Sequence, residues 1–598
     1  MNFNSPHSFH IPVMGLGYTI DTPVKVARFG ISSVVSIIQD DLVEQMRKFY
    51  CEAEGLKYTA ISTKDIDHRA KRIRAYLNLL KQIVDAQVQK LKAEAFGKGK
   101  DIDKYFRLLP DSSPDKHLYT EMNALGEGPE KEALQQKLRQ RIIPGAIDVN
   151  IMTKVDNPSY DKAGKPLPDE YSDALSALRG FALSELSSAV VFSAGLNPRL
   201  FAYLEKFSDF YPDENGNIKK KIILKVSDYR SALIQGKFLA KKGIYISEFR
   251  IESGLNCGGH AFPTEGHLLG PILEEFRTKR EELSHELFPL LEKALADKKL
   301  PFPSAAGGIR VSVQGGIGTA EEDAFLREYY KVHSTGWGSP FLLVPEATNV
   351  DQHTLEMLAT AQEEDYYLSH SSPLGLPFNN FRKSSAEEQR KERIMKHRPG
   401  SPCYKKHLAF NTEFTPQPIC TASRQYQNLK IRQLTEQQIP GAEFQEEFDL
   451  ITEKDCLCEG LSVAVLLKNR LPVEHHLEAV TICPGPNLAY FSGIFSLEDM
   501  VAHIYGRKNI LNARNRPHMF LKELKMYVDF FKTEAEKCRA TITAKQKSYL
   551  SAFRSNLDKG IAYYQSMLLQ LAFGKREVAL RINADLEDSA RVLANVVL

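Results

Sequence analysis

Three short motifs bring together residue types that can bind an anion and move a proton. Residues 252–260 read Glu-Ser-Gly-Leu-Asn-Cys-Gly-Gly-His, so His260 directly follows Gly258 and Gly259. Glycines let the backbone approach a ligand closely, and an imidazole near neutral pKa suits proton abstraction beside a redox cofactor. We therefore predict that His260 is the catalytic base. A buried structural histidine is the alternative, and His267 is a weaker candidate for the base.

Two further glycine motifs fit an anion-binding site. Gly315 and Gly316 follow an apolar run just before a helix begins at Thr319, and Gly338 and Ser339 adjoin the next apolar run. Backbone N–H groups that glycines expose at the start of a helix bind anions. Either motif alone would be an ordinary turn. Two of them at consecutive strands predict a phosphate-binding site.

Apolar segments alternate with helical segments over about the first 380 residues. The predicted strands cover residues 10–16, 31–37, 146–152, 189–194, 221–226, 246–251, 309–314 and, for the eighth, either 340–344 or an earlier stretch that ends at the turn of residues 336–338. Parallel strands that are buried on both faces read as continuous apolar runs. Eight βα units favour a closed barrel over an open sheet, so we predict an α/β fold, a (β/α)₈ TIM barrel over residues 1–380.

Two long segments do not fit the barrel repeat. Residues 40–140 contain amphipathic helices, such as residues 71–92, and we predict a helical insertion after the second strand. Residues 381–598 are predicted to be a mostly helical C-terminal extension that begins with a charged connecting segment. Its apolar strips, such as residues 461–467, need a partner surface, and no long flexible linker precedes them. We therefore expect the extension to pack on the barrel.

Composition and charge exclude several classes of protein. The formal net charge is +3, from 78 basic and 75 acidic residues, which is too balanced for nucleic acid to be the main ligand. No apolar run approaches the roughly 20 residues that a membrane-spanning helix needs. The first residues lack the basic and apolar regions of a signal peptide, so we expect a cytoplasmic protein.

Eight cysteines are spread over the chain without a C-x-x-C pair. Cys456 and Cys458 form a C-x-C motif, and Cys403, Cys420 and Cys483 lie at long separations. Reduced, partly buried thiols are the favoured interpretation for an intracellular protein, so we predict no metal site. A metal or iron–sulfur site drawn from these five cysteines is the alternative, although the familiar ligand spacings are absent.

The motifs taken together resemble a known family. They are Met14-Gly15 after the first strand, Asn150 in the third, Ser-Ala-Gly at residues 193–195, Gly-Gly-His at 258–260, and Gly315-Gly316. The series resembles the nitronate monooxygenases, also called 2-nitropropane dioxygenases, which are similar to flavin-dependent enoyl reductases. Lys-Val-Ser at residues 225–227 and Gly-Gly-Ile-Gly-Thr at 315–319 look closer to the enoyl reductases. The resemblance covers about residues 10–380.

The resemblance implies that the barrel holds FMN. It assigns roles as follows: contacts with the flavin ring to Met14, Gly15 and Asn150; contacts with the phosphate to Gly315, Gly316, Gly338 and Ser339; a place near the pyrimidine edge to Lys225; and the base to His260 after Gly258 and Gly259. The chain departs from the family pattern at residues 338–341, where Gly-Ser-Pro-Phe replaces the usual Gly-Thr-Arg-Phe. The insertion and the extension have no counterpart in the family.

Three functions follow as hypotheses. The first is an FMN-dependent oxidoreductase of the nitronate monooxygenase type, which uses oxygen on a small substrate with an acidic carbon. The second is an FMN-dependent enoyl reductase that takes electrons from NAD(P)H and acts on an acyl-thioester. The third is a non-catalytic scaffolding barrel whose helical extension binds a partner. The oligomeric state is left open.

Overall fold

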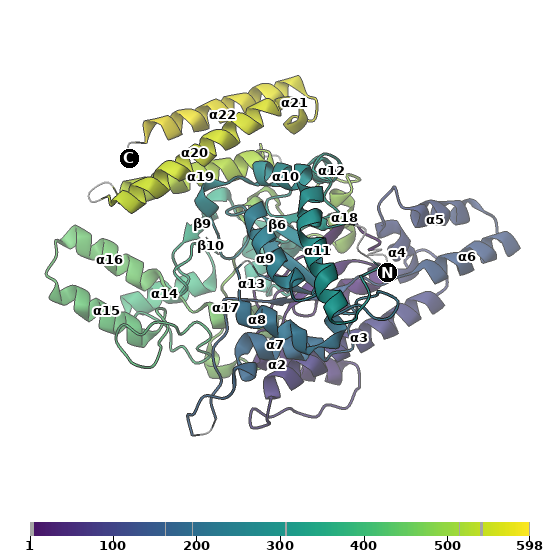
Figure 1. The fold of residues 1–598 in the computed structure, drawn as a ribbon, viewed down its shortest axis with the longest axis horizontal. Helices are drawn as coiled ribbons and strands as arrows, with labels where there is room; N and C mark the ends of the chain where they lie inside the picture. Colours follow the sequence, from purple (N-terminus) through teal and green to yellow (C-terminus); the bar gives the residue numbers. More distant parts are fainter. Residues whose placement is uncertain are drawn as a thin grey trace.

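The computed structural model describes residues 5–161, 163–193, 195–304, 308–512, 515–538 and 542–596. Eight parallel strands close into a barrel in chain order, and helices surround them (Figure 1). The strands are β1 (Phe9–Ile11), β2 (Ser32–Ser36), β3 (Ile147–Ile151), β4 (Ala189–Phe192), β5 (Lys221–Val226), β6 (Ile246–Glu252), β7 (Arg310–Gln314) and β8 (Ser334–Gly336). The predicted (β/α)₈ barrel is confirmed.

Two of the predicted strands, the first and the eighth, have other bounds in the structure. The first strand was expected over residues 10–16, but β1 ends at Ile11, because Pro12 has no N–H for the ladder and turns the chain into a loop. For the eighth strand, the placement at residues 340–344 is wrong, since Ser339–Leu343 form a 3-10 helix. The earlier placement is right, and Gly336 of β8 pairs with β1 to close the barrel. Ala194, the predicted end of the fourth strand, lies outside the described residues.

Helices cover the outside of the barrel. In chain order they are α1 (Thr22–Val26), α2 (Asp40–Ala53), α7 (Asp173–Ala182), α8 (Pro198–Tyr203), α9 (Tyr229–Ala240), α10 (Leu269–Thr278), α11 (Arg280–Asp297), α12 (Ala320–Glu328) and α13 (Gln352–Ala359). The strands β3 and β4 are buried along their whole length, as expected for parallel strands between a helical layer and a filled interior.

The insertion is helical, as predicted. It adds α3 (His68–Ala93), α4 (Asp101–Leu108), α5 (Pro114–Ala124) and α6 (Pro129–Arg141) after α2. Helix α3 packs against α2 and α7, and its Arg72 donates to Asp40 at the start of α2 at 2.8 Å. The insertion therefore extends the outer helical layer on one side of the barrel (Figure 1).

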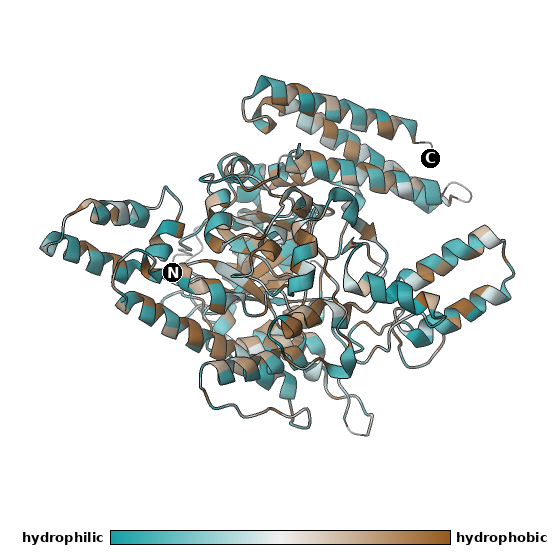
Figure 2. Cartoon of the chain, turned by 180° about the vertical axis from the view of Figure 1, so that it is seen from behind, coloured by the Kyte–Doolittle hydropathy of each residue, from teal (hydrophilic) through white to brown (hydrophobic). Residues whose placement is uncertain are grey.

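The C-terminal region is mostly helical. It follows a hairpin of β9 (Tyr366–Ser369) and β10 (Phe378–Phe381), and its helices are α14 (Ser385–Met395), α15 (Arg424–Glu436), α16 (Gly441–Glu453), α17 (Leu457–Lys468), α18 (Leu497–Ile504), α19 (Met519–Lys537), α20 (Ala544–Ser566), α21 (Leu568–Leu571) and α22 (Arg576–Asn595). Helices α19, α20 and α22 stack on one side of the barrel, and α15 and α16 project from another (Figure 1). Apolar residues concentrate in the barrel strands and on one side of many helices (Figure 2).

Buried polar contacts join α19 to the barrel. Glu523 is 1% exposed and accepts from the Ser253 hydroxyl at 2.6 Å and from the Leu269 amide at 2.8 Å. Leu269 is the first residue of α10, so the carboxylate of Glu523 satisfies a free N–H at that helix start. Helix α19 thus holds the loop between β6 and α10, which carries His260.

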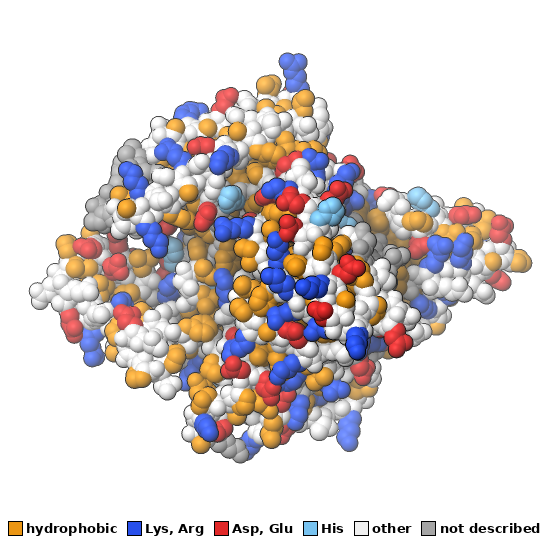
Figure 3. Space-filling view, in the orientation of Figure 1, with side chains coloured by type: hydrophobic (Ala, Val, Ile, Leu, Met, Phe, Trp, Pro, Cys, Tyr) orange, Lys and Arg blue, Asp and Glu red, His pale blue; other side chains and the backbone are white. Residues whose placement is uncertain are grey.

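The barrel interior contains an ion pair. Glu248 and Arg250 are two residues apart on β6, so their side chains share the face of the strand that points into the barrel. Arg250 Nη2 donates to Glu248 at 2.8 Å. Burial alone would raise the pKa of Glu248, but Arg250 holds it at about 2. On the surface drawn in Figure 3, acidic and basic side chains are interspersed. Among the described residues, no helix is long and apolar enough to cross a membrane.

Candidate functional site

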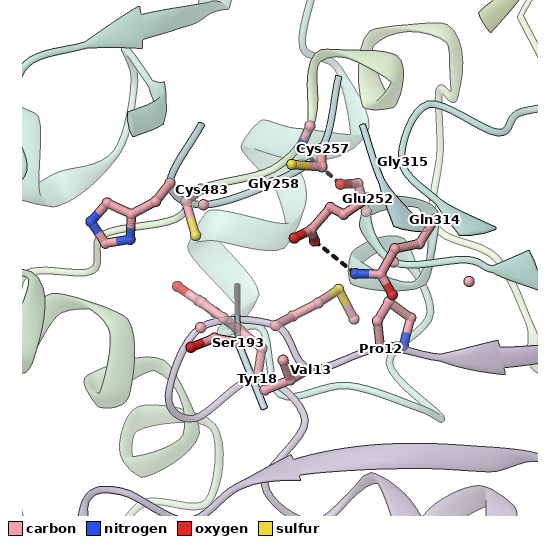
Figure 4. Close-up of a pocket in the computed structure, with 18 of the residues that line it drawn as sticks. Pro12, Val13, Tyr18, Ser193, Glu252, Cys257, Gly258, Gln314, Gly315 and Cys483 are labelled. Carbon is pink, nitrogen blue, oxygen red and sulfur yellow. Dashed lines mark hydrogen bonds between the residues drawn. The ribbon is translucent and has the colours of Figure 1, made fainter. Parts of the chain in front are cut away.

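A cavity of about 220 Å³ lies at the C-terminal ends of the barrel strands. This is the face on which TIM barrels place their active sites. The structure brings all of the predicted site residues to its wall, namely Met14, Gly15, Asn150, Lys225, Gly258, Gly259, His260, Gly315, Gly316, Gly338 and Ser339. These residues come from the ends of β1, β3, β5, β6, β7 and β8. Figure 4 shows Pro12, Glu252 and Gln314, which come from three of these strand ends, around the same space.

Four backbone amides beyond β7 and β8 have free hydrogens. Within the described part of the chain, the N–H groups of Gly315, Gly316, Gly338 and Ser339 donate to no protein acceptor. The Ser339 hydroxyl accepts from the Gly485 amide at 2.8 Å, which leaves its own proton free to donate. Such a set of donors at two neighbouring strand ends can bind a phosphate.

An arginine from the extension braces the turn after β7. Arg516 donates to both oxygens of Glu322, at 2.7 and 2.8 Å, and to the carbonyl of Gly316 at 2.7 Å. The side chains of Arg516 and Glu322 are 7% and 1% exposed. Glu322 also accepts from the Gly318 amide at 2.9 Å, so Gly318 is occupied in holding the turn. These contacts hold the side of the turn that faces away from the cavity, so the side that carries the free amides of Gly315 and Gly316 faces the cavity.

Two amide side chains in the cavity wall have unsatisfied acceptors. Asn150 is 4% exposed and Gln314 is 6% exposed, and neither Asn150 Oδ1 nor Gln314 Oε1 has a hydrogen-bond partner among the described residues. A buried carbonyl oxygen without a donor costs about 1–3 kcal/mol. Both oxygens are therefore suited to accept from N–H groups of a bound ligand.

Three side chains in the cavity wall, two of them charged, are linked to one another. Lys225 of β5 pairs with Glu252 Oε2 at 2.7 Å, and Gln314 Nε2 donates to Glu252 Oε1 at 2.7 Å. Figure 4 shows Glu252 and Gln314 facing each other with this hydrogen bond drawn. Glu252 thus fixes the rotamers of both neighbours and orients the free oxygen of Gln314. Sequence reasoning predicted Lys225 and missed Glu252 and Gln314, although both are polar residues at predicted strand ends.

His260 is half-buried at the cavity wall. Its Nε2 lies 2.7 Å from the hydroxyl of Ser372, and its ring meets Phe378 edge-on at 5.1 Å. Burial, and then the charge of Lys154, lower the pKa of His260 to about 4, so the imidazole is neutral at pH 7 and has a lone pair to accept a proton. His267, the weaker candidate, is exposed and lies within 3.3 Å of the Asn556 amide nitrogen, outside this cavity.

Lys154 contributes a positive charge to the cavity wall. Its ammonium lies over the ring of Phe262 at 4.3 Å, and no described carboxylate is within ion-pair distance of it. Its charge reaches His260, because it contributes to the lowered pKa of that imidazole. An anionic ligand group near His260 would meet this cation. The residue was missed because a single lysine in a loop carries no sequence signal.

The extension forms the roof of the cavity. Leu461 of α17, together with Ile482, Cys483, Gly485 and Asn487, lines the cavity opposite the strand ends. The Gly259 amide donates to the Cys483 carbonyl at 3.0 Å. A Cβ at Gly258 would lie 2.6 Å from the same carbonyl oxygen. Gly258 and Gly259 therefore leave room for the segment around Cys483 to pack against this loop, and they also leave the backbone beside His260 open to a ligand.

A second cavity, of about 480 Å³, adjoins the first. The two share the side chains of Lys154, Lys225, Glu252 and Phe262 in their walls. Gln235 of α9 lines the second cavity, is 6% exposed and has an unpaired Oε1 within the described residues. The site therefore has room for a ligand that reaches beyond the first cavity.

Comparisons with protein-family models and with curated proteins found no match.

Proposed function

We propose that the protein is an FMN-dependent oxidoreductase of the nitronate monooxygenase type. The observation that carries the proposal is the set of four free amides beyond β7 and β8, in the same cavity as a neutral histidine. Taken singly, the free amides and the neutral histidine each have a purely structural explanation. Their convergence at the C-terminal face of a barrel supports a phosphorylated redox cofactor.

The residues of the cavity fit FMN. The phosphate would be held by the amides of Gly315, Gly316, Gly338 and Ser339, and a dianion there would accept charge-assisted hydrogen bonds. The unpaired oxygens of Asn150 and Gln314 would accept from the ring N–H, with Met14, Gly15 and Lys225 as further neighbours. When bound, FMN would supply the capacity to accept electrons from the substrate.

The protein residues then supply acid–base chemistry and electrostatics. The Ser372 hydroxyl holds His260 Nε2 and orients the ring, and His260 Nδ1 takes a proton from the substrate carbon. As the proton leaves, negative charge grows on the substrate, and the ammonium of Lys154 stabilises it. The same negative charge favours the protonated imidazole, which offsets the effect of burial on His260. Small anions or carbon acids that become anionic are the expected substrates.

An enoyl reductase is the second candidate, and the second cavity favours it. A space of about 480 Å³ that meets the first at Lys154 and Phe262 can accept a long acyl-thioester or a nicotinamide donor. In that case the reductant is NAD(P)H, and His260 donates or positions a proton instead of removing one.

The source of the electrons that reduce the flavin distinguishes the monooxygenase from the enoyl reductase. The protein is loaded with FMN and mixed without oxygen with either a neutral nitroalkane, which still carries its acidic proton, or NADPH, while the flavin absorbance is followed. Rapid bleaching by the nitroalkane alone supports the monooxygenase, and rapid bleaching by NADPH alone supports the enoyl reductase. Bleaching by neither contradicts both.

A matched pair of variants tests the cofactor site. Gly338→Val places a side chain in the cavity, where its Cβ has Pro12 Cγ at 3.2 Å as its nearest neighbour. Gly97→Val makes the same change at a loop position whose Cβ meets only Lys100 at 3.8 Å. Gly338→Val should lose FMN and Gly97→Val should retain it. Equal retention by two folded variants would contradict the phosphate assignment.

A further inference from the structure

The second cavity is large enough to hold part of a substrate. Its volume of about 480 Å³ exceeds the 220 Å³ of the first cavity, and ligand cavities commonly measure about 300–1,000 Å³. The two cavities meet at Lys154, Lys225, Glu252 and Phe262, which line both. A group that occupies the second cavity can therefore belong to a substrate whose reacting carbon lies in the first.

Apolar side chains from three separate segments line the second cavity. Leu196 follows β4, Ile234 lies on α9 and Tyr549 lies on α20. They are 46%, 51% and 39% exposed, so water contacts apolar surface here. Val226 and Pro263 add to the apolar lining. An aliphatic chain that covered these side chains would remove apolar surface from water, which favours binding.

One side chain of the second cavity has an unsatisfied acceptor. Gln235 of α9 is 6% exposed, and its Oε1 has no hydrogen-bond partner among the described residues. The hydroxyls of Ser227 and Ser231, which also line the cavity, both donate to Asp228, at 2.9 and 2.8 Å. A buried acceptor without a donor is costly, so Gln235 Oε1 is suited to accept from a hydroxyl or an amide N–H of a ligand.

We propose that the substrate is an aliphatic carbon acid whose chain carries a hydroxyl or an amide N–H group. Its acidic carbon reacts in the first cavity, and its chain lies against Leu196, Ile234 and Tyr549 in the second. The polar group of the chain donates to Gln235 Oε1, which makes Gln235 a specificity-determining residue. This inference rests on the proposed function, because it extends the substrate of that oxidation into the second cavity.

Unreactive carboxylates test the substrate class without electron transfer. The carboxylate replaces the anion that forms on the substrate carbon. The protein, with and without FMN, is titrated by calorimetry with butanoate, hexanoate and octanoate. Affinity should rise about two- to fourfold with each added CH₂ until the second cavity is filled. Among octanoates that carry a hydroxyl at different positions along the chain, one should bind about 3- to 10-fold more tightly than octanoate itself.

Three variants assign these effects to side chains. Gln235→Leu should abolish the advantage of the hydroxyl and bind octanoate at least as tightly as the wild type, because leucine keeps much of the volume and removes the acceptor. Ile234→Ser should weaken the binding of octanoate and leave that of butanoate unchanged. Leu580→Ser is the matched control, because Leu580 of α22 is 66% exposed and lines neither cavity. It should bind every probe as the wild type does.

Equal affinity of the wild type for butanoate and octanoate would overturn the inference, and this measurement needs no substitution. A hydroxyl advantage that survives in folded Gln235→Leu would also overturn it. Competitive binding of NADPH that Ile234→Ser weakens would assign the second cavity to a nicotinamide donor, with the same consequence. A protein that binds the chains as expected, but whose flavin no carbon acid reduces, would contradict the proposed function and leave the chain-binding site standing.

Discussion

Replacing Arg516 with methionine removes the brace behind the proposed phosphate site. Methionine keeps most of the apolar stem, so the change deletes the charge and its four hydrogen bonds: two to Glu322, one to Asn487 and one to the Gly316 carbonyl. Glu322 then keeps only the amides of Gly318 and Met519 as donors. The turn that carries two of the four free amides loses its support from behind.

The expected loss of stability follows from burial. Glu322 is 1% exposed, and leaving a buried charge without its partner costs about 3–5 kcal/mol. Lys508→Met is the matched control, because Lys508 pairs with Asp499 at 2.6 Å while the two side chains are 52% and 35% exposed. An exposed pair contributes about 0–1 kcal/mol, so this control should change stability little.

The pH dependence of the loss has a definite sign. In the wild type, burial would raise the pKa of Glu322, but Arg516 holds it below its ordinary value of 4.5. The stabilisation by Glu322 is therefore complete above pH 4.5 and is lost as the pH falls through the folded-state pKa. In Arg516→Met, the charge that most opposes the effect of burial is gone and backbone amides such as that of Gly318 remain, so the pKa of Glu322 rises and the variant loses stability relative to the wild type as the pH rises. The gap between the two proteins should widen with pH.

Urea unfolding followed by circular dichroism measures this gap at about pH 7.5 and about pH 4.5. FMN titration of the same proteins should show weaker binding by Arg516→Met and unchanged binding by Lys508→Met. Adding Glu322→Gln to Arg516→Met removes the uncompensated charge and should restore part of the stability at the higher pH. A loss no greater than that of Lys508→Met, or a larger loss at low pH than at high pH, would refute the reasoning.

The remaining predictions concern the base, the cation and the α19 contact. His260→Ala should keep FMN and lose about 10²- to 10⁴-fold in turnover. In the wild type, kcat/KM should stay flat down through pH 6.5 and fall only near the His260 pKa of about 4, so an inflection at 6.5 would contradict a base whose pKa is lowered by its surroundings. Lys154→Met should raise KM for anionic substrates and shift the acidic fall of kcat/KM to higher pH, because the charge that lowers the His260 pKa is gone. An unchanged pH profile would contradict the influence of Lys154 on His260. Glu523→Ala leaves the Ser253 hydroxyl and the Leu269 amide without an acceptor and should cost roughly 2–4 kcal/mol, measured as a lower Tm. An unchanged Tm would mean that α19 does not hold the loop of His260.

The barrel could be predicted because its strands are apolar runs separated by helices. That signal failed at the eighth strand, where Pro340 and the apolar residues after it form a 3-10 helix while the short, polar β8 (Ser334–Gly336) closes the barrel. A strand of three residues is held by its neighbours on both sides, so its own sequence has little pattern.

The candidate site could be predicted where glycines and a histidine follow strands, and much less elsewhere. Gly315 and Gly316 are recognisable because they directly follow an apolar run, and His260 is recognisable because it follows two glycines beyond the sixth strand. Arg516 and Cys483 come from the extension, more than 150 residues along the chain, and no local period or spacing links them to the barrel loops. Contacts of that kind are set by tertiary packing, which the sequence pattern does not encode locally.

The central claim is that the amides beyond β7 and β8 hold the phosphate of FMN, and comparative titration tests it most directly. The protein, freed of any bound flavin, is titrated with FMN and with riboflavin, which has the same ring but no phosphate. Charge-assisted hydrogen bonds to the phosphate should make FMN bind about 10- to 100-fold more tightly. Equal affinity for the two flavins, or no binding of either by the folded protein, would contradict the account.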